Sequence, residues 1–193
     1  MKNLKSYKKL YKDDRFYREI FVDEIYKDVF DKKKDIVLDI GALAGEFSFW
    51  INGGKVYAIE PEVKYYEELI SNIEEFGFNN VEPFNIAISG SDGDRKFNIR
   101  ERGGSALNEV GSEIVKTLSL ASFMKENNIP YIDVLKIDIE NGEKEVFEAE
   151  SFKEVAGKIS CIIGEHLASV GGLLTKYGFN SIETSSGNLL FER

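Results

Sequence analysis

Two glycines and two acids in the first third of the chain have the types and order needed to hold a nucleotide. Gly41 and Gly45 follow the apolar run 36–40, which carries Asp39, and Glu60 follows a second apolar run. Glycine lets the backbone approach a ligand closely because it has no Cβ, and an acid after the second strand can accept hydrogen bonds from both ribose hydroxyls. We therefore expect an adenosine-binding turn at 39–45, with Glu60 at the ribose.

The spacing of this turn argues against a dinucleotide. The dinucleotide fingerprint G-x-G-x-x-G requires glycines where this chain has Leu43 and Glu46. Leu43 also places a side chain where a pyrophosphate needs bare backbone, and the Asp39 carboxylate repels phosphate but attracts a cation. An adenosine ligand with a positively charged tail and no phosphate is S-adenosylmethionine, which we predict as the cofactor.

A second group of acids follows the apolar run 132–137. Asp138 and Glu140 come directly after it, and Glu143 begins the next amphipathic segment. Ligands of open α/β sheets bind beyond the carboxyl ends of the strands, so we expect both residues near the transferred methyl group. Asp138 would orient the cofactor's amino group or an acceptor hydroxyl; Glu140 would act similarly or help to hold a metal, although we assign no metal site. Glu143 is expected to cap a helix.

His166 is the third catalytic candidate and the only histidine of the chain. It follows the apolar run 159–163, and the near-neutral pKa of histidine suits removal of a hydroxyl proton. The alternative is an ordinary loop or helix-start histidine. Methyl transfer could then rely on alignment and desolvation alone.

The apolar runs that position these residues alternate with amphipathic segments. The run 36–40 does not alternate between apolar and polar residues, which is typical of a strand buried on both faces. Further strands are predicted at 56–59, 81–87, 132–137 and 159–163. Helices are expected at 45–51, 62–76, 118–127, 143–152 and 167–177, and a hairpin is expected at 181–184 and 188–191 around a turn at 185–187. Pro83 suggests an edge strand. This order predicts a doubly wound, mostly parallel α/β sheet with an antiparallel strand at its C-terminal end.

The first thirty residues are predicted to be helical. Apolar residues recur every three to four positions over 6–30, which indicates one or two amphipathic helices. We expect a single domain over 1–193, with a helical extension at 1–31 and the sheet-containing core at 32–193. The loop from Glu101 to Glu109, with glycines at 103 and 104, is a candidate lid over the cleft.

Charge and composition limit the classes of partner and the cellular compartment that we expect. A net charge of -9 argues against a nucleic-acid partner, whose phosphates call for a basic face. The single cysteine, Cys161, suits a reducing compartment and a buried position. The sequence shows no secretory or membrane-spanning run, so we expect a cytoplasmic protein without a membrane partner. The oligomeric state is left open.

Several motifs together resemble the FkbM family of class I S-adenosylmethionine-dependent methyltransferases. The turn 39–47 resembles its opening motif, and further matches are Glu60-Pro61, Leu69 with Asn72, and Asn85-Ile86-Ala87-Ile88 with Asp92-Gly93. The most specific match is Lys136-Ile137-Asp138-Ile139-Glu140-Asn141-Gly142-Glu143, which is similar to the family's K-I-D-x-E-G-x-E. Asn141 stands at a position where the family has glycine, and Ala121 stands where it usually has aspartate.

The resemblance implies a class I fold with a seven-stranded sheet and a defined cofactor cleft. Its lining would comprise Asp39, Gly41, Ala42, Gly45, Glu60, Pro61, Ile86, Ala87 and Asp138. Asp39 and the turn would face the methionine end of the cofactor, Glu60 the ribose, and Ile86-Ala87 the adenine.

A hydroxyl oxygen is the expected methyl acceptor. The Asn/Asp-Pro-Pro-aromatic motif of amino-group methylation does not follow the fourth predicted strand. Methylation of a pyrimidine at C5 needs a nucleophilic cysteine, but Cys161 lies inside a predicted strand. The predicted activity is therefore O-methylation of a small molecule or a sugar-containing metabolite, which agrees with FkbM-type chemistry. The alternatives are a cofactor-binding subunit without catalysis and an NAD-binding oxidoreductase.

Overall fold

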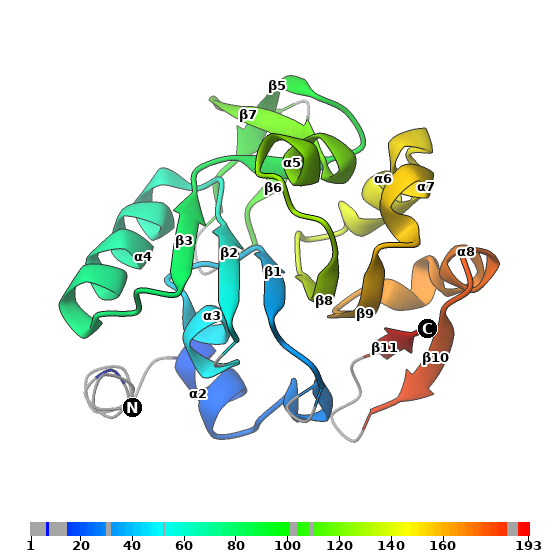
Figure 1. Cartoon of the computed structure of the whole chain (residues 1–193). Helices are drawn as coiled ribbons and strands as arrows, with labels where there is room; N and C mark the ends of the chain where they lie inside the picture. Colours follow the sequence, from blue (N-terminus) through cyan, green and yellow to red (C-terminus); the bar gives the residue numbers. More distant parts are fainter. Residues whose placement is uncertain are drawn as a thin grey trace.

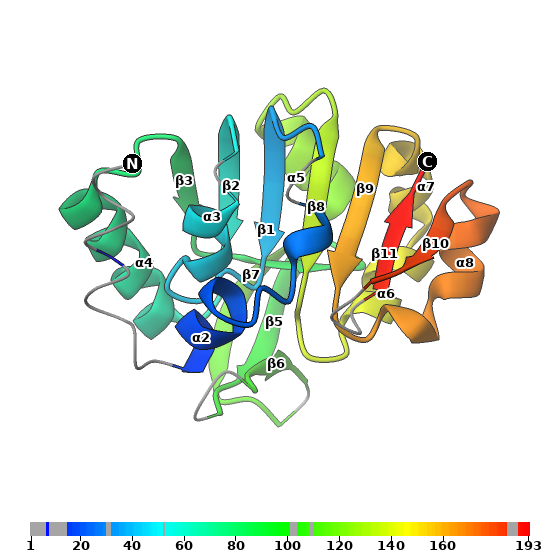
Figure 2. The same cartoon turned by 90° about the horizontal axis from the view of Figure 1, so that it is seen from below.

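A seven-stranded sheet forms the centre of the molecule (Figures 1 and 2). The structure, a computed structural model, describes residues 7, 15–29, 32–51, 53–100, 104–108, 110–184 and 189–193. The strands, in spatial order, are β10 (Asn180–Glu183), β11 (Leu189–Glu192), β9 (Ile159–Gly164), β8 (Ile132–Ile137), β1 (Ile36–Ile40), β2 (Lys55–Ile59) and β3 (Val81–Phe84). β11 runs antiparallel to β9 and β10, whereas the other neighbouring strands pair in parallel. The predicted fold class is confirmed, and β3 with its Pro83 lies at the sheet edge as expected.

The register aligns the carboxyl ends of the central strands. Ile40, the last residue of β1, pairs with Ile59 of β2 and with Ile137 of β8, and Ile137 pairs with Gly164 of β9. The strand order reverses between β1 and β8, because the chain passes from β1 outward to β3 and then returns to β8 on the other side. Ligands of open α/β sheets bind at such a reversal, so residues that follow these four strand ends converge on the candidate site.

Helices cover both faces of the sheet, because the central strands are apolar on both sides. The helical segments are α2 (Arg15–Phe21), η1 (Lys27–Val29), α3 (Glu46–Trp50), α4 (Val63–Phe76), α5 (Leu120–Glu126), α6 (Glu143–Glu148), α7 (Glu150–Ala156), η2 (Leu167–Ser169) and α8 (Gly171–Lys176). Buried side chains of α2, α3 and α4 pack with Val37 and Val134 on one face, whereas those of α5 to α8 pack with Leu38 and Leu135 on the other. Figure 2 shows α2 and α3 in front of the sheet and α5 and α7 behind it.

A second, smaller sheet lies beyond the carboxyl ends of the parallel strands (Figure 2). In spatial order it contains β4 (Ala87–Ser89), β7 (Glu113–Ser119), β5 (Gly93–Asn98) and β6 (Ala106–Leu107). The strand predicted at 81–87 ends at Phe84, because the Asn85 amide donates to the carbonyls of Glu60 and Pro61 at 2.9 and 3.0 Å and turns the chain. Ala87 then pairs with Thr117 in the second sheet.

Three predicted helices differ from the structure by more than one residue at an end or are divided in it. The helix expected at 143–152 is divided into α6 and α7, because Ala149 is extended with ψ of 138°. The segment 167–177 forms η2 and α8 rather than one helix. The helix expected from Leu118 begins at Leu120, because Ser119 is its N-cap and accepts a hydrogen bond from the Ser122 amide.

Both ends of the chain are partly described. Of the helical region predicted at 6–30, residues 6, 8–14 and 30 lie outside the described residues; the described part contains α2 and η1. The predicted C-terminal hairpin is confirmed by the antiparallel pairing of β10 with β11, whereas its turn at 185–187 lies outside the described residues. Within the described part of the chain, every helix is too short or too polar to cross a membrane.

Candidate functional site

A cavity of about 730 Å³ opens where the strand order reverses. Several predicted site residues line it: Gly41, Ala42, Glu60, Pro61, Ala87, Asp138 and Glu140. Four others do not line it: Asp39, Gly45, Ile86 and His166. The second sheet, the described part of the candidate lid and the segment around α2 complete the walls. The structure thus brings the strand-end acids and the glycine turn together around one space.

The turn after β1 directs its amides into the protein. The N–H groups of Gly41 and Ala42 both donate to the carbonyl at the end of β2, at 3.0 Å. Leu43 donates to Glu60 Oε2 at 2.9 Å, and Gly45 donates back to the Ala42 carbonyl at 2.9 Å. A glycine-rich turn that binds a pyrophosphate needs N–H groups pointing at the ligand. These four amides are already hydrogen-bonded, so this turn suits a ligand without a phosphate.

Gly41 sits where the backbone of β1 meets the backbone after β8. Its φ is +80°, and a Cβ added there would lie 2.0 Å from the carbonyl oxygen of Asp138. The turn at Gly41 therefore requires glycine for two reasons, the left-handed conformation and the close approach of a second strand end.

We expect Gly41→Ala to lower the free energy of unfolding by about 2–4 kcal/mol, because it adds left-handed strain and a clash with backbone. Gly172→Ala is the matched control: a Cβ there meets nothing within 4 Å, so stability should stay within about 1 kcal/mol of wild type. Urea unfolding measures both variants. Equal midpoints for the two would contradict the close packing at Gly41.

Glu60 is a buried carboxylate at the end of β2, with 4% of its surface exposed. Its two oxygens accept the amides of Leu43 and Glu62, at 2.9 and 2.8 Å, and each oxygen retains a further lone pair. Burial raises the pKa of Glu60 to about 7, although the amides of Glu62 and Leu43 and the charge of Lys136 act in the opposite direction. Glu60 therefore lines the cavity with unused acceptor capacity.

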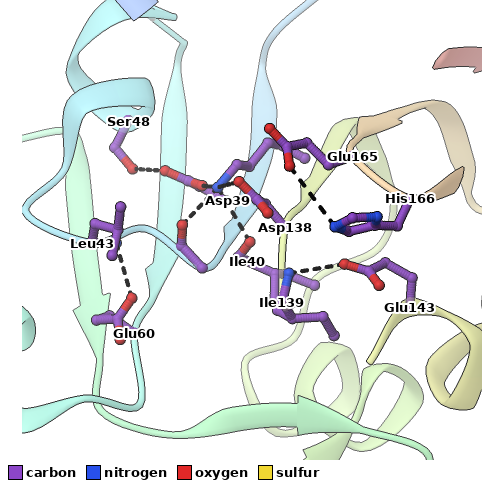
Figure 3. Close-up of polar contacts among 12 residues, drawn as sticks. Asp39, Ile40, Leu43, Ser48, Glu60, Asp138, Ile139, Glu143, Glu165 and His166 are labelled. Atoms are coloured by element: carbon purple, nitrogen blue, oxygen red, sulfur yellow. Dashed lines mark hydrogen bonds and ion pairs between the residues drawn. The ribbon is translucent and has the colours of Figure 1, made fainter. Parts of the chain in front are cut away.

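Asp39, predicted to face the cofactor, is fully buried and does not line the cavity. It accepts a hydrogen bond from Ser48 Oγ at 2.6 Å (Figure 3), and Lys136 Nζ lies 3.3 Å from its Oδ1. Lys136 Nζ also donates to the Gly41 carbonyl at 2.6 Å and lies 4.0 Å from Asp138 Oδ2. Burial alone would lower the pKa of Lys136, but the charges of Asp39 and Asp138 outweigh it and raise that pKa. Asp39 thus acts through Lys136 on the shape of the turn.

Lys136 belongs to the FkbM-like signature, which by itself indicates no role for this lysine. The available signal was a lysine inside the otherwise apolar end of a strand, Val134-Leu135-Lys136-Ile137. A charged residue in a buried strand requires a partner, which here is a carboxylate on the neighbouring strand. The identity of that partner depends on the strand order.

The loop after β8 holds its acids in an unusual backbone conformation. Glu140 and Asn141 have φ of 55° and 74°, in the left-handed region. Asparagine is among the non-glycine residues enriched there, which accounts for Asn141 at a position where the FkbM signature has glycine. Glu143 is 1% exposed and accepts the amide of Ile139 at 2.9 Å (Figure 3), so it braces this loop rather than capping the first turn of α6.

The residues after β9 place one acid in the cavity wall and the histidine outside it. Glu165, which sequence reasoning did not select, lines the cavity. The side chain of His166 is 41% exposed, and its Nε2 lies 3.9 Å from Glu165 Oε2 (Figure 3). Burial first, and then the charge of Asp138, raises the pKa of both Glu140 and Glu165.

The described part of the candidate lid, residues 104–108, lines the cavity. Ser105 Oγ donates to Glu62 Oε2 at 2.8 Å and also accepts the amide of Arg100. This contact ties the loop to the N-terminal end of α4, next to Glu60. Residues 101–103 and 109 of the predicted lid lie outside the described residues.

The sheet order, the antiparallel β11 and the cavity at the strand reversal define a class I methyltransferase-like fold. Residues 39–172 match the family described as the Methyltransferase FkbM domain. This match covers more than half of the chain, so the chain belongs to the FkbM family and is a methyltransferase.

Solved methyltransferases share this architecture. The FkbM methyltransferase from Methylobacillus flagellatus superposes with a TM-score of 0.58 and 14% identity, over 83% of this chain and 44% of that chain. A methyltransferase from Geobacter sulfurreducens superposes with a TM-score of 0.56 and 14% identity, over 99% of this chain and 89% of that chain. At such identities the likeness establishes the fold.

A curated relative is the hexuronic acid methyltransferase AglP of Haloferax volcanii. The two chains are 26% identical over 121 residues, which are 61% of this chain and 50% of that protein. The chain thus matches about half the length of this relative.

Proposed function

We propose that this methyltransferase uses S-adenosylmethionine to methylate a hydroxyl oxygen of a small molecule or a sugar-containing metabolite. The main support for this cofactor is that four backbone amides of the turn already donate hydrogen bonds within the protein. They are the amides of Gly41, Ala42, Leu43 and Gly45. That arrangement favours an adenosine ligand without phosphates over NAD, and family membership points the same way. The sugar acceptor is supported by the name of the Haloferax volcanii relative.

The residues present fit S-adenosylmethionine. Glu60 has free lone pairs for ribose hydroxyls, and the turn at Gly41 leaves no room for a Cβ. We propose that Gly41, Ala42, Glu60, Pro61, Ala87 and Asp138 contact the cofactor from the cavity wall. Asp39, Gly45 and Ile86 would act behind that wall: Asp39 through Lys136, Gly45 by close packing against Phe49 and Leu69, and Ile86 by packing against the core.

The bound cofactor would supply an electrophilic methyl group on a sulfonium sulfur. Asp138 would orient the acceptor hydroxyl, and a carboxylate oxygen of Glu140 would take its proton as the oxygen–methyl bond forms. Burial, followed by the charge of Asp138, raises the pKa of Glu140 and makes it a stronger base. His166 remains the alternative base, at a position outside the cavity wall.

Calorimetric titration with S-adenosylhomocysteine and with NAD tests the choice of cofactor. We expect micromolar binding of S-adenosylhomocysteine and no NAD binding. Micromolar NAD binding without S-adenosylhomocysteine binding would overturn the proposal in favour of an oxidoreductase. Transfer of a labelled methyl group to a panel of hydroxyl compounds then tests catalysis. Binding without transfer to any acceptor, including an extract of the source cells, would favour a non-catalytic cofactor-binding subunit.

We expect Glu140→Gln to lower kcat for the acceptor about tenfold, below the 10²–10⁴ typical of general bases, because methyl transfer depends chiefly on alignment. S-adenosylhomocysteine binding should not change. Glu154→Gln, on the exposed side of α7, is the matched control and should keep wild-type kcat. His166→Ala should stay within about threefold of wild type. The reverse ranking of Glu140→Gln and His166→Ala would assign the proton to His166.

A further inference from the structure

The segment around α2 supplies a wall of the cavity that the proposed chemistry does not explain. Arg15, Phe16 and Glu19 of α2 line the cavity, as does Tyr26 further along the chain. The cavity is also lined by the acids that follow β8 and β9, namely Asp138, Glu140 and Glu165. The predicted N-terminal extension therefore contributes side chains to the same space as the strand-end acids.

Tyr26 brings a polar group into this wall. Its side chain is 1% exposed, and its ring packs edge-on against Phe47 with ring centroids 5.1 Å apart. Burial, followed by the charges of Asp138 and Glu165, raises the pKa of its hydroxyl, so the hydroxyl remains protonated. A protonated hydroxyl in the cavity wall can donate a hydrogen bond to a ligand and can accept one from it.

Two positive charges in the described cavity wall are paired with carboxylates. Arg15 Nε lies 2.8 Å from Glu19 Oε1. Lys136 is held by Asp39 and the Gly41 carbonyl. Arg100 also lines the cavity, where its charge acts to lower the pKa of Glu140. Acidic side chains outnumber these cations in the described lining, so the wall disfavours the carboxylate or phosphate of an acceptor.

The negative charges at the strand ends are compensated less completely. Asp138 has its described ionic contact with Lys136 at 4.0 Å, a lysine shared with Asp39. Glu165 has its described ionic contact with His166 at 3.9 Å, which is attractive only when the imidazole is protonated. Among the described residues, no three carboxylate, histidine or cysteine side chains are arranged to hold a metal. These oxygens are therefore available to accept hydrogen bonds.

We propose that Tyr26, Asp138 and Glu165 form an acceptor subsite for an uncharged, hydroxyl-rich compound such as a neutral sugar. This inference rests on the proposed methyltransferase function and names its substrate class. The carboxylates accept hydrogen bonds from the sugar hydroxyls, and the Tyr26 hydroxyl makes a further one. The same carboxylates repel a carboxylate or phosphate on the ring. The chain would thus differ in acceptor from the relative named for hexuronic acid.

The charge of the methylated product tests this inference. The full chain is incubated with methyl-labelled S-adenosylmethionine and a small-molecule extract of the source cells, and mild acid then frees labelled sugars from phosphate carriers. We expect the label to pass through an anion exchanger at pH 7. Label retained as a carboxylate or sugar phosphate would overturn the subsite and leave the methyltransferase proposal standing. If no fraction contained label while the protein still bound S-adenosylhomocysteine, both the proposed catalysis and the proposed subsite would be overturned.

Tyr26→Phe provides a second measurement with the labelled acceptor fraction. It should raise the KM for the acceptor about tenfold, with the affinity for S-adenosylhomocysteine unchanged within twofold. Tyr17→Phe is the matched control, because this buried tyrosine of α2 does not line the cavity. An unchanged acceptor KM in Tyr26→Phe would contradict the subsite, as would equal effects of the two substitutions.

Discussion

Replacing Lys136 by methionine is expected to lower the free energy of unfolding by about 3–5 kcal/mol. Methionine fills a similar volume but leaves Asp39, which is 0% exposed, without its cation. It also removes the donor to the Gly41 carbonyl, which joins the turn after β1 to the end of β8. Breaking one side of a buried ion pair is costly because the remaining charge is desolvated and unmatched. Urea unfolding at pH 7 measures the loss.

Two further variants distinguish the unmatched charge from a general packing defect. Lys136→Met combined with Asp39→Asn leaves no buried charge, so the double variant should lose clearly less stability than the sum of the single losses. Lys144→Met removes an exposed lysine paired with Glu148 at 3.8 Å and should change stability by less than about 1 kcal/mol. If Lys136→Met unfolded at the wild-type midpoint, Lys136 would have no structural role.

Replacing Glu60 by glutamine is expected to raise the Kd for S-adenosylhomocysteine about 100-fold. Two ribose hydroxyls donating to an ionised carboxylate contribute about 1.5 kcal/mol each, and about 3 kcal/mol corresponds to that ratio. Glutamine lacks the charge and offers one acceptor oxygen, while the amides of Leu43 and Glu62 compete for it. Glu67→Gln, at an exposed position on α4, is the matched control and should bind like wild type.

The same carboxyl should make cofactor affinity depend on pH. The pKa of Glu60 in the free protein is raised to about 7, so the group is largely protonated below that pH. Because the ribose hydroxyls bind the ionised form, affinity is present above about pH 8 and is lost as the pH falls through 7. Calorimetry in two buffers of different ionisation enthalpy should detect release of about half a proton at pH 7. Constant affinity from pH 6 to 8 would contradict this assignment.

The two predictions are linked through one charge. Lys136 lowers the pKa of Glu60, so Lys136→Met should move the midpoint of the pH dependence upward. In Glu60→Gln the dependence between pH 6 and 8 should disappear. A dependence that persisted in Glu60→Gln would identify another titrating group, for which Glu140 and Glu165 are the cavity acids with raised pKa.

The main sheet was predictable because its signals are local. Strands buried on both faces, such as β8, give mostly apolar runs, and Pro83 marks an edge because proline has no N–H for the ladder. The second sheet was largely missed for the opposite reason. Only Phe97 of β5 is buried and β6 has two residues, so neither strand has a clear apolar pattern.

The residues of the candidate site also differ in whether a local sequence pattern indicates them. The sequence predicted that Gly41, Glu60, Asp138 and Glu140 would lie close together, because each follows a strand end and parallel strands bring their carboxyl ends to one edge. The structure places all four around one cavity. The sequence did not place Tyr26 and Glu165 in the cavity wall, because no local pattern indicates that a segment before the sheet will line the same cavity as the end of β9.

By itself the sequence determined a doubly wound α/β fold, a glycine turn that does not match a dinucleotide site, and a signature that resembles the FkbM family. Apolar periodicity and residue spacing along a strand–turn–helix unit carry that information, and both are properties of the chain alone. Only the tertiary structure decided that Asp39 is buried against Lys136, that His166 lies outside the cavity wall and that Tyr26 lies within it. The physical reason is that burial and charge pairing depend on which distant segments the strand order places side by side.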